Sequence, residues 1–272
     1  MAGMKPFVDP PQREAPDESV SNGCFETMRA YGGRIFRLED HLDRLFASAK
    51  FLGTRMPEDR RRLGRRLREA LARSGLKEAV VRIALMPRRE GSACPSIVVQ
   101  SVTVPPGSAY RRGIRIAVVP ARKFAVGSID PQAKYSARLG SVLAVTDAQL
   151  RGVEEALFMD AIGSVTESTA SNFGIVSGGA ILTPPCWLGL LAGITRDVLF
   201  ELSEHLHVPI RETPLTRHEV YNAEEAFLTS TLKEVLAVTW VDGRKIGSGR
   251  PGAITRRLHR AFRTLVKREL HL

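Results

Sequence analysis

The sequence has few cysteines, no long hydrophobic run and no glycine-rich phosphate cradle of the Walker or Rossmann type, and each absence excludes a class of protein. Its three cysteines, Cys24, Cys94 and Cys186, are far apart in the chain, so they indicate a reducing compartment without a disulfide framework and without a metal site. No apolar run is long enough to span a membrane, and residues 1–16 are polar and proline-rich. We therefore expect a cytoplasmic protein that does not associate with membranes.

The composition is that of a globular protein with excess positive charge. A chain of 272 residues with 43% hydrophobic and 25% charged residues can form two domains of ordinary size. The net charge of +11 is densest at residues 59–68, which could be a nucleic-acid surface or a solvated helix face. Leu63, Leu67 and Leu71 recur at helical spacing without an aromatic platform, which favours a solvated amphipathic helix. We expect no nucleic-acid partner, although a basic surface attracts anionic substrates.

Hydrophobic periodicity predicts an α+β fold in two domains. A strand over residues 23–31 leads into a Gly32-Gly33 hairpin turn. Residues 120–130 lack strong periodicity, so we predict a small N-terminal domain (residues 1–119), a linker (120–130) and a larger domain (131–272). The other expected helices cover residues 39–52, the basic segment, 138–151, 195–206 and 253–270; the other expected strands cover 79–86, 96–104, 113–119, 155–160, 164–167, 173–176, 225–229 and 237–241.

Lys134 is the residue most informative about function, because several motifs follow it in a suggestive order. It lies in Ala133-Lys134-Tyr135-Ser136, and after it come a polar stretch around Glu167, then Gly193-Ile194-Thr195 before a helix, then Ser230-Thr231. Each motif alone is common on protein surfaces. Together they supply the groups that hold pyridoxal phosphate: a lysine for the Schiff base, a carboxylate for the pyridinium nitrogen and helix-start amides for the phosphate.

These ordered motifs resemble those of the class IV aminotransferases, the pyridoxal-phosphate enzymes of fold type IV. The likeness runs from Asn22 to Phe262 and includes Phe36-Arg37-Leu38-Glu39-Asp40-His41-Leu42-Asp43-Arg44-Leu45. The family contains D-amino-acid aminotransferases, branched-chain aminotransferases and aminodeoxychorismate lyases. The resemblance implies a smaller N-terminal α/β domain, a larger C-terminal domain with the cofactor between them, and a homodimer.

The resemblance also assigns roles to individual residues. Lys134 matches the lysine that forms the Schiff base and moves the α-proton, and Glu167 matches the carboxylate that pairs with the ring nitrogen. Many relatives have asparagine three residues after the lysine, where this chain has Ala137, so that supporting contact is replaced or missing. The other residues implied to contact the cofactor are Arg44, Ser168, Ser171, Asn172, Ile194, Thr195, Ser230 and Thr231.

Substrate recognition is expected to depend on the first long strand and on a loop that contains arginines. Phe25, Thr27 and Arg29 share one face of this strand by period-two alternation, with Glu26 on the other face. The corresponding strand lines the active site in the family, so these three residues are candidate substrate contacts. Arg29 and Arg88 are the candidates for the substrate carboxylate, because a planar guanidinium can bind a carboxylate through two hydrogen bonds.

We predict a transaminase that moves an amino group between an amino acid and an α-keto acid by a ping-pong mechanism. D-amino acids are the favoured donors, because residues 193–262 resemble the D-amino-acid subfamily. Two alternatives remain open: a branched-chain L-amino-acid aminotransferase and an aminodeoxychorismate lyase. The segment Phe25-Glu26-Thr27 resembles the sequences of the lyases more closely. A non-catalytic, nucleic-acid-binding basic protein is a further alternative, and Lys134, Glu167 and the phosphate turns argue against it.

Overall fold

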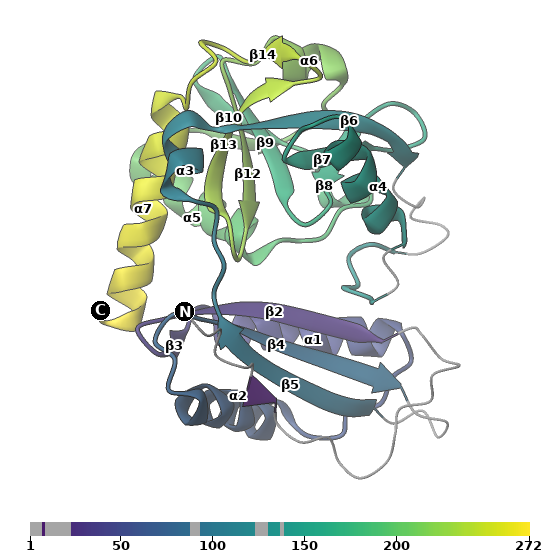
Figure 1. Cartoon of the computed structure of the whole chain (residues 1–272), viewed down its shortest axis with the longest axis vertical. Coiled ribbons are helices and arrows are strands. Elements are labelled where there is room, and N and C mark those ends of the chain that lie inside the picture. The colour runs from purple at the N-terminus through teal and green to yellow at the C-terminus, as the bar shows by residue number, and fades with distance from the viewer. Residues whose placement is uncertain (1–6, 9–22, 88–92, 123–129, 137–138) are drawn as a thin grey trace. The chain divides into compact units, whose positions relative to one another are not determined.

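The computed structural model describes residues 7–8, 23–87, 93–122, 130–136 and 139–272, which divide into two compact units (Figure 1). The first unit comprises residues 1–103, 133–137 and 266–272, and the second comprises residues 104–132 and 138–265. The predicted boundary at residue 119 differs from this division, because the strand β6 (Ile114–Arg122) pairs with two strands of the second unit. Most of the predicted linker, residues 120–130, lies outside the described residues.

The first unit contains an antiparallel sheet in the order β1-β5-β4-β2-β3. A hairpin turn at Gly32-Gly33 joins β2 to β3 as predicted, and both glycines have positive φ values, 57° and 82°, which residues with a Cβ rarely adopt. The elements of this unit are β1 (Phe7–Val8), β2 (Cys24–Tyr31), β3 (Arg34–Ile35), α1 (Leu38–Phe51), α2 (Arg60–Ser74), β4 (Ala79–Pro87) and β5 (Ala93–Ser101).

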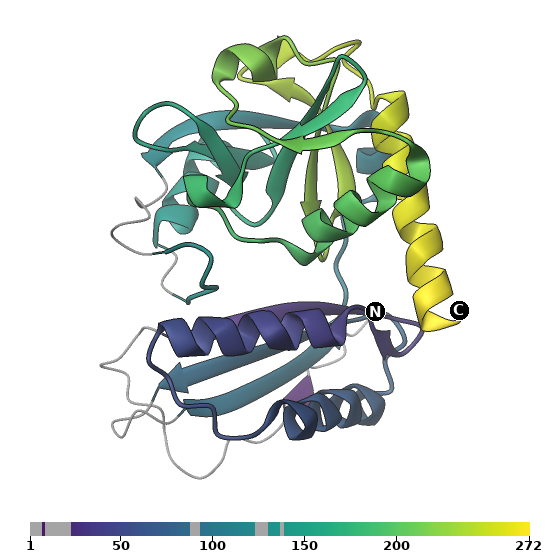
Figure 2. The same cartoon turned by 180° about the vertical axis from the view of Figure 1, so that it is seen from behind.

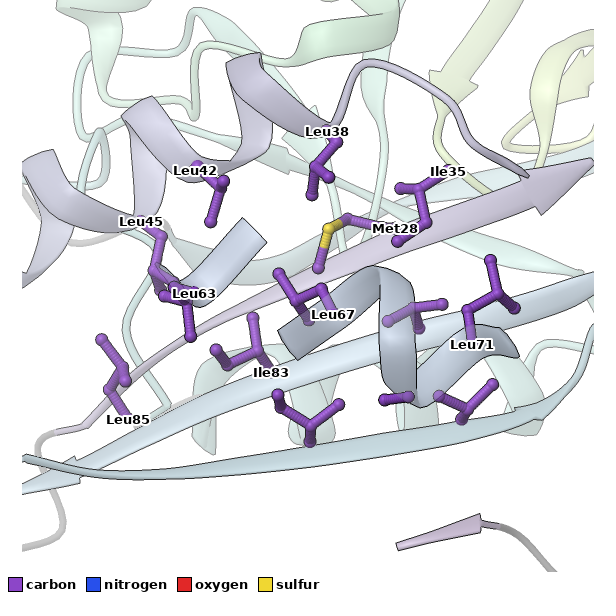
Figure 3. Packing of buried hydrophobic residues seen from close by; sticks show 14 of the residues in the cluster. Met28, Ile35, Leu38, Leu42, Leu45, Leu63, Leu67, Leu71, Ile83 and Leu85 are labelled. Carbon is purple, nitrogen blue, oxygen red and sulfur yellow. The ribbon is translucent and has the colours of Figure 1, made fainter. Parts of the chain in front are cut away.

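Both helices of the first unit cover the same face of its sheet (Figure 3). Met28 of β2 and Ile83 of β4 point to that face, where they pack against Leu42 of α1 and Leu67 of α2. All four side chains are almost completely buried, and burial of one such side chain contributes about 1.5–3 kcal/mol to stability. Alternate residues of β2 must therefore point away from this core, which fixes the face on which Phe25, Thr27 and Arg29 lie.

The predicted basic helix is α2, and several of its arginines pair with acidic side chains. The helix begins after Asp59, whose carboxylate accepts a hydrogen bond from the amide of Arg62 at 2.7 Å. On its outer surface Arg68 pairs with Glu39 at 2.9 Å, and further pairs join Arg60 to Asp43 and Arg66 to Glu58. Arg62 and Arg68 are exposed, as expected for the solvated helix face that the leucine spacing predicts.

The second unit is built on a nine-stranded mixed sheet (Figures 1 and 2). Its order is β11-β10-β9-β12-β13-β6-β7-β8, with β14 paired to β13, and β8 also pairs with β9. The strand pairing therefore closes into a ring that runs through β9, β12, β13, β6, β7 and β8. Besides β6, the strands are β7 (Glu155–Met159), β8 (Val165–Ser168), β9 (Asn172–Ser177), β10 (Ala180–Thr183), β11 (Ile210–Glu212), β12 (Glu225–Ser230), β13 (Glu234–Val241) and β14 (Arg244–Lys245).

The helices of the second unit differ in how well the sequence predicted them. The long ones, α4 (Leu139–Leu150), α5 (Ile194–Leu206) and α7 (Ala253–Leu270), begin and end within about a residue of the expected bounds, whereas α3 (Gly107–Arg112) and α6 (Arg217–Tyr221) were not expected. The last residues of α7 belong to the first unit, where Arg37 pairs with Glu269 at 2.6 Å. None of the helices in the described residues is long and apolar enough to cross a membrane.

Candidate active site

Lys134 lies in a short segment of the first unit that runs beside β2. The amide of Phe25 donates a hydrogen bond to the carbonyl of Lys134 at 3.0 Å, and the amide of Ser136 donates to the carbonyl of Gly23 at 2.7 Å. On its other side, the amide of Lys134 donates to Oγ of Ser48 in α1 at 3.0 Å. Backbone hydrogen bonds on both sides of Lys134 therefore hold this segment, and its side chain is half-buried.

The amine of Lys134 lies beside a residue predicted to contact substrate. Its Nζ is 5.0 Å from the ring centroid of Phe25, which is within the range of a cation–π interaction. The guanidinium carbon of Arg82 lies 4.6 Å from the same ring. Phe25 is buried, and both the predicted catalytic lysine and an arginine of the neighbouring strand lie close to its ring. Thr27 follows on the same face and is half-buried.

Arg29 continues this face of β2 and is almost fully buried. Its Nη2 lies 3.6 Å from Oε2 of Glu78, and its guanidinium carbon lies 4.2 Å from the ring centroid of Tyr31. The described residues thus give Arg29 a carboxylate partner within its own unit. A role toward a substrate carboxylate stays a prediction, and Glu78 is the competitor for the guanidinium. The second candidate, Arg88, lies outside the described residues.

Glu26 lies on the opposite face of β2, as predicted, and forms a buried network with α1. Its carboxylate accepts two hydrogen bonds from Arg44, from Nε at 2.7 Å and from Nη2 at 2.9 Å, and lies 2.8 Å from Nδ1 of His41. Burial raises the pKa of Glu26, but the charge of Arg44 and the hydrogen bonds from His41 and Arg44 outweigh burial and lower this pKa to about 2. Burial lowers the pKa of His41, and the nearby charges of Arg44 and Lys134 also lower it, against the opposing effect of Glu26.

Three consequences follow for the predicted residues of this network. The pKa of about 2 favours an ionised Glu26, and the lowered pKa of His41 favours its neutral form, which can donate an Nδ1 proton to this carboxylate. Arg44, expected at the phosphate, is already bound to Glu26 through two hydrogen bonds, so its guanidinium is oriented by a buried carboxylate. Its contact with a phosphate stays a prediction.

In the second unit, Glu167 at the end of β8 is held by groups from two other segments. Its Oε2 accepts a hydrogen bond from the amide of Leu191 at 3.1 Å and another from Nδ2 of Asn172 at 3.3 Å. Asn172 also donates from Nδ2 to the carbonyl of Leu191 at 2.8 Å. Glu167 and Asn172 are both buried. The predicted carboxylate is therefore fixed in orientation, which a partner for a ring nitrogen needs.

Polar groups without hydrogen-bond partners lie close to Glu167 in the chain and in the sheet. Oγ of Ser168 and Oγ1 of Thr229 are buried and, among the described residues, accept or donate no hydrogen bond. Thr229 is the cross-strand partner of Asn172 in the pairing of β12 with β9. Buried hydroxyl groups of native proteins are almost always satisfied, so these two are available to a polar group of a ligand. They fit a cofactor with a ring hydroxyl and a phosphate.

The start of α5 packs tightly against Asn172. A Cβ on Gly193 would lie 1.8 Å from Oδ1 of Asn172, so only glycine fits here. Gly193 is the N-cap residue, and no side chain caps the helix. The amides of Ile194 and Thr195 are in the first turn, where amides have no acceptor within the helix and the helix dipole favours an anion. A phosphate would satisfy both conditions.

Ser230 and Thr231 lie where β12 turns into β13, and both are half-buried. Ser171, the other predicted hydroxyl, is buried in the turn between β8 and β9. The second unit therefore gathers Glu167, Asn172 and the start of α5, with two hydroxyl-bearing turns on neighbouring strands. The contacts of all these residues with a cofactor stay predictions. In the described residues no group of three or more histidine, cysteine or acidic side chains is placed to hold a metal ion.

Sequence patterns did not identify three residues that position the predicted groups. Ser48 binds the backbone of Lys134, Leu191 supplies an amide to Glu167, and Lys233 contacts the turn that contains Ser171. A backbone amide carries no residue-specific signal, and a serine inside an amphipathic helix has an ordinary sequence context. Lys233 could have been noticed because it lies two residues after Thr231 of the predicted phosphate turn.

Comparisons with known proteins identify one family of similar proteins. Residues 23–241 match the family described as amino-transferase class IV. A branched-chain-amino-acid aminotransferase of Pseudomonas aeruginosa is 35% identical over 265 residues, which cover 92% of this chain and 86% of that protein. The crystal structure of a T.th. branched-chain amino acid aminotransferase with pyridoxamine 5'-phosphate superposes with a TM-score of 0.89 at 27% identity and covers 98% of this chain and 95% of that one. The same enzyme complexed with N-(5'-phosphopyridoxyl)-L-glutamate has a TM-score of 0.88, the same identity and the same coverage.

The chain belongs to the class IV aminotransferases. Its α+β architecture of two sheets is the fold type IV that the ordered motifs predict. It is therefore a transaminase, which transfers an amino group between amino acids and keto acids. The relatives support the branched-chain alternative, and none of those named here supports the favoured prediction of D-amino acids.

Proposed function

We propose that this protein is a pyridoxal-phosphate-dependent transaminase that acts on branched-chain L-amino acids and an α-keto acid acceptor. The observation that carries the substrate class is the match over 92% of the chain to a named branched-chain enzyme. The structure of a similar enzyme bound to an adduct of L-glutamate supports the L configuration. A homodimer and a cytoplasmic location remain expectations from the sequence.

Class IV aminotransferases use pyridoxal phosphate, which supplies an aldehyde for the amino group and a ring that stabilises negative charge at the substrate Cα. In this chain Lys134 would hold the aldehyde carbon and move the α-proton. Glu167, oriented by Asn172 and Leu191, would keep a proton on the ring nitrogen. The phosphate would be held by the start of α5 and by the side chains of Thr195, Ser230, Thr231 and Arg44.

The half-reaction of the holoenzyme with single amino acids tests the proposed substrate class. We expect L-leucine, L-isoleucine and L-valine to convert the cofactor to its amine form at least roughly tenfold faster than D-alanine or D-glutamate. A side chain that misfits a hydrophobic pocket by one methylene costs about 1–3 kcal/mol, which is roughly 10–200-fold in rate. The measurement is the rate of the absorbance change in stopped flow.

Other outcomes of this panel would identify the alternatives. Faster conversion by D-amino acids would restore the D-amino-acid prediction. Release of pyruvate and 4-aminobenzoate from aminodeoxychorismate, with little conversion by any amino acid, would identify a lyase. A protein whose absorbance band is absent and whose mass does not change with borohydride would not bind the cofactor covalently.

Replacement of Arg29 by alanine tests whether this residue binds the substrate carboxylate. Charged hydrogen bonds contribute about 1.5–3 kcal/mol, so the KM for L-leucine and for its keto acid should rise by roughly one to two decades. The KM for a carboxylate-free amine such as phenylethylamine should rise much less. Glu78→Gln is the matched control, because it removes the partner that Arg29 has in the structure. Equal losses on leucine and on the amine, reproduced by Glu78→Gln, would show that Arg29 only supports the strand.

A further inference from the structure

Lys233 lies in the turn between β12 and β13, two residues after Thr231, the second of the predicted phosphate residues Ser230 and Thr231. Its amine donates hydrogen bonds to Oε2 of Glu155 and, at 3.1 Å, to Oγ of Ser171. The side chain of Lys233 is only 22% exposed and that of Glu155 only 7% exposed. This lysine is therefore committed to two partners in a largely buried place, unlike a lysine that extends into water.

Glu155 connects the same amine to a third segment of the unit. It is the first residue of β7, and its Oε1 accepts a hydrogen bond from Oγ1 of Thr169. Thr169 and Ser171 both belong to the turn between β8 and β9, which follows Glu167. The ion pair of Lys233 with Glu155 thus joins the turn of Ser230 and Thr231 to the turn that carries Ser171.

The backbone of the β12–β13 turn is held as well. The amide of Lys233 donates to Oγ of Ser230 at 3.2 Å, and the hydroxyl of Tyr110 donates to the carbonyl of Lys233 at 3.1 Å. The next residue, Glu234, is fully buried with a φ of 53°, and its Oε2 lies 2.7 Å from Nε2 of His259. These contacts hold the backbone around Lys233 locally, and the side chain of Lys233 is the part that joins this turn to the turn of Ser171.

We infer that Lys233 is a positioning residue for the phosphate end of the cofactor site: it holds the Ser230–Thr231 turn against the turn of Ser171. The inference rests on the proposed function, because the two turns carry residues predicted to contact the cofactor. Hydroxyl groups bind a phosphate well only when they are already in place, since ordering them on binding costs free energy. A simple attraction between the lysine charge and the phosphate is the competing explanation.

Titration of the apoenzyme with pyridoxal phosphate and, separately, with pyridoxal tests this role. Both compounds carry the aldehyde, but only the first carries the phosphate. For Lys233→Met we expect the Kd of pyridoxal phosphate to rise about ten- to a hundredfold, the range for charged hydrogen bonds, and the Kd of pyridoxal to change by less than about twofold. Lys233→Arg should restore most of the affinity. Lys245→Met, which removes an exposed lysine of β14, is the matched control and should behave as wild type.

Glu155→Gln separates positioning from simple attraction and also serves if Lys233→Met does not fold. Loss of the ion pair should weaken pyridoxal phosphate binding if Lys233 acts by position. Loss of a negative charge should strengthen it if Lys233 acts by charge alone, which would overturn the inference. The effects of Lys233→Met and Glu155→Gln on the free energy of pyridoxal phosphate binding should also be non-additive in the double variant. If the ratio of the Kd of pyridoxal phosphate to the Kd of pyridoxal is the same in Lys233→Met as in the wild type, only this role of Lys233 is overturned. If the wild-type apoenzyme binds neither compound, the proposed function is overturned.

Discussion

Replacement of Lys134 by alanine should abolish transamination and leave the fold intact. The backbone of Lys134 makes the hydrogen bonds that place its segment against β2 and α1, and alanine keeps all of them. The amine lies 5.0 Å from the ring centroid of Phe25 in a cation–π contact, and its charge contributes to the lowered pKa of His41. Proton transfer by a positioned side chain alone contributes about 10²–10⁴ to a rate, and the loss of covalent attachment adds to this. We therefore expect a decrease in kcat of at least roughly 10³-fold.

Mass spectrometry after borohydride reduction gives a second readout for Lys134. In the wild-type protein the peptide that contains Lys134 should gain the mass of the reduced cofactor, and the alanine variant should gain none. Lys50→Ala, which removes an exposed lysine at the end of α1, is the control and should retain both activity and attachment. Wild-type transamination by the Lys134→Ala protein would show that another residue forms the bond to the cofactor.

The regular elements of the fold could be predicted because their patterns are local. The stripe of leucines in α2 and the alternation in β2 are visible within one element, and the Gly32-Gly33 turn needs only two residues. The short elements β10, β11, α3 and α6 were not predicted, because three to six residues are too few for a period to show. The domain division also differs, because β6 joins its sheet through β13, a strand more than 100 residues later.

The candidate site shows the same limit. Alternation correctly placed Glu26 on the face opposite Phe25, but it could not show that Arg44 and His41 bind this carboxylate. Resemblance to the family identified Glu167, whereas its support by the Leu191 amide depends on a contact 24 residues apart. Lys233 and Glu155 are 78 residues apart, and nothing local to either one indicates the pair. What the sequence could not predict is therefore the set of groups that orient the predicted residues.

Replacement of Glu167 by glutamine should cost a large part of the rate while the cofactor stays bound. Glutamine is nearly isosteric, and its amide oxygen can still accept the hydrogen bonds that Asn172 and Leu191 donate to Oε2. It carries no charge, so it cannot stabilise a protonated ring nitrogen, and the ring becomes a weaker electron acceptor when the α-proton leaves. Because this interaction matters most in the transition state, kcat should fall more than cofactor affinity.

The half-reaction with L-leucine, protonated or deuterated at Cα, measures this effect at the proton-transfer step. Removal of one preorganised electrostatic group typically costs about 10²–10³-fold in kcat, and we expect Glu167→Gln to fall in this range. The isotope effect should increase or stay large, because proton abstraction becomes the slower step. Glu204→Gln, which removes an exposed carboxylate from α5, should react at the wild-type rate. An unchanged rate of the deuterium-sensitive step in Glu167→Gln would mean that another group maintains the proton on the ring nitrogen.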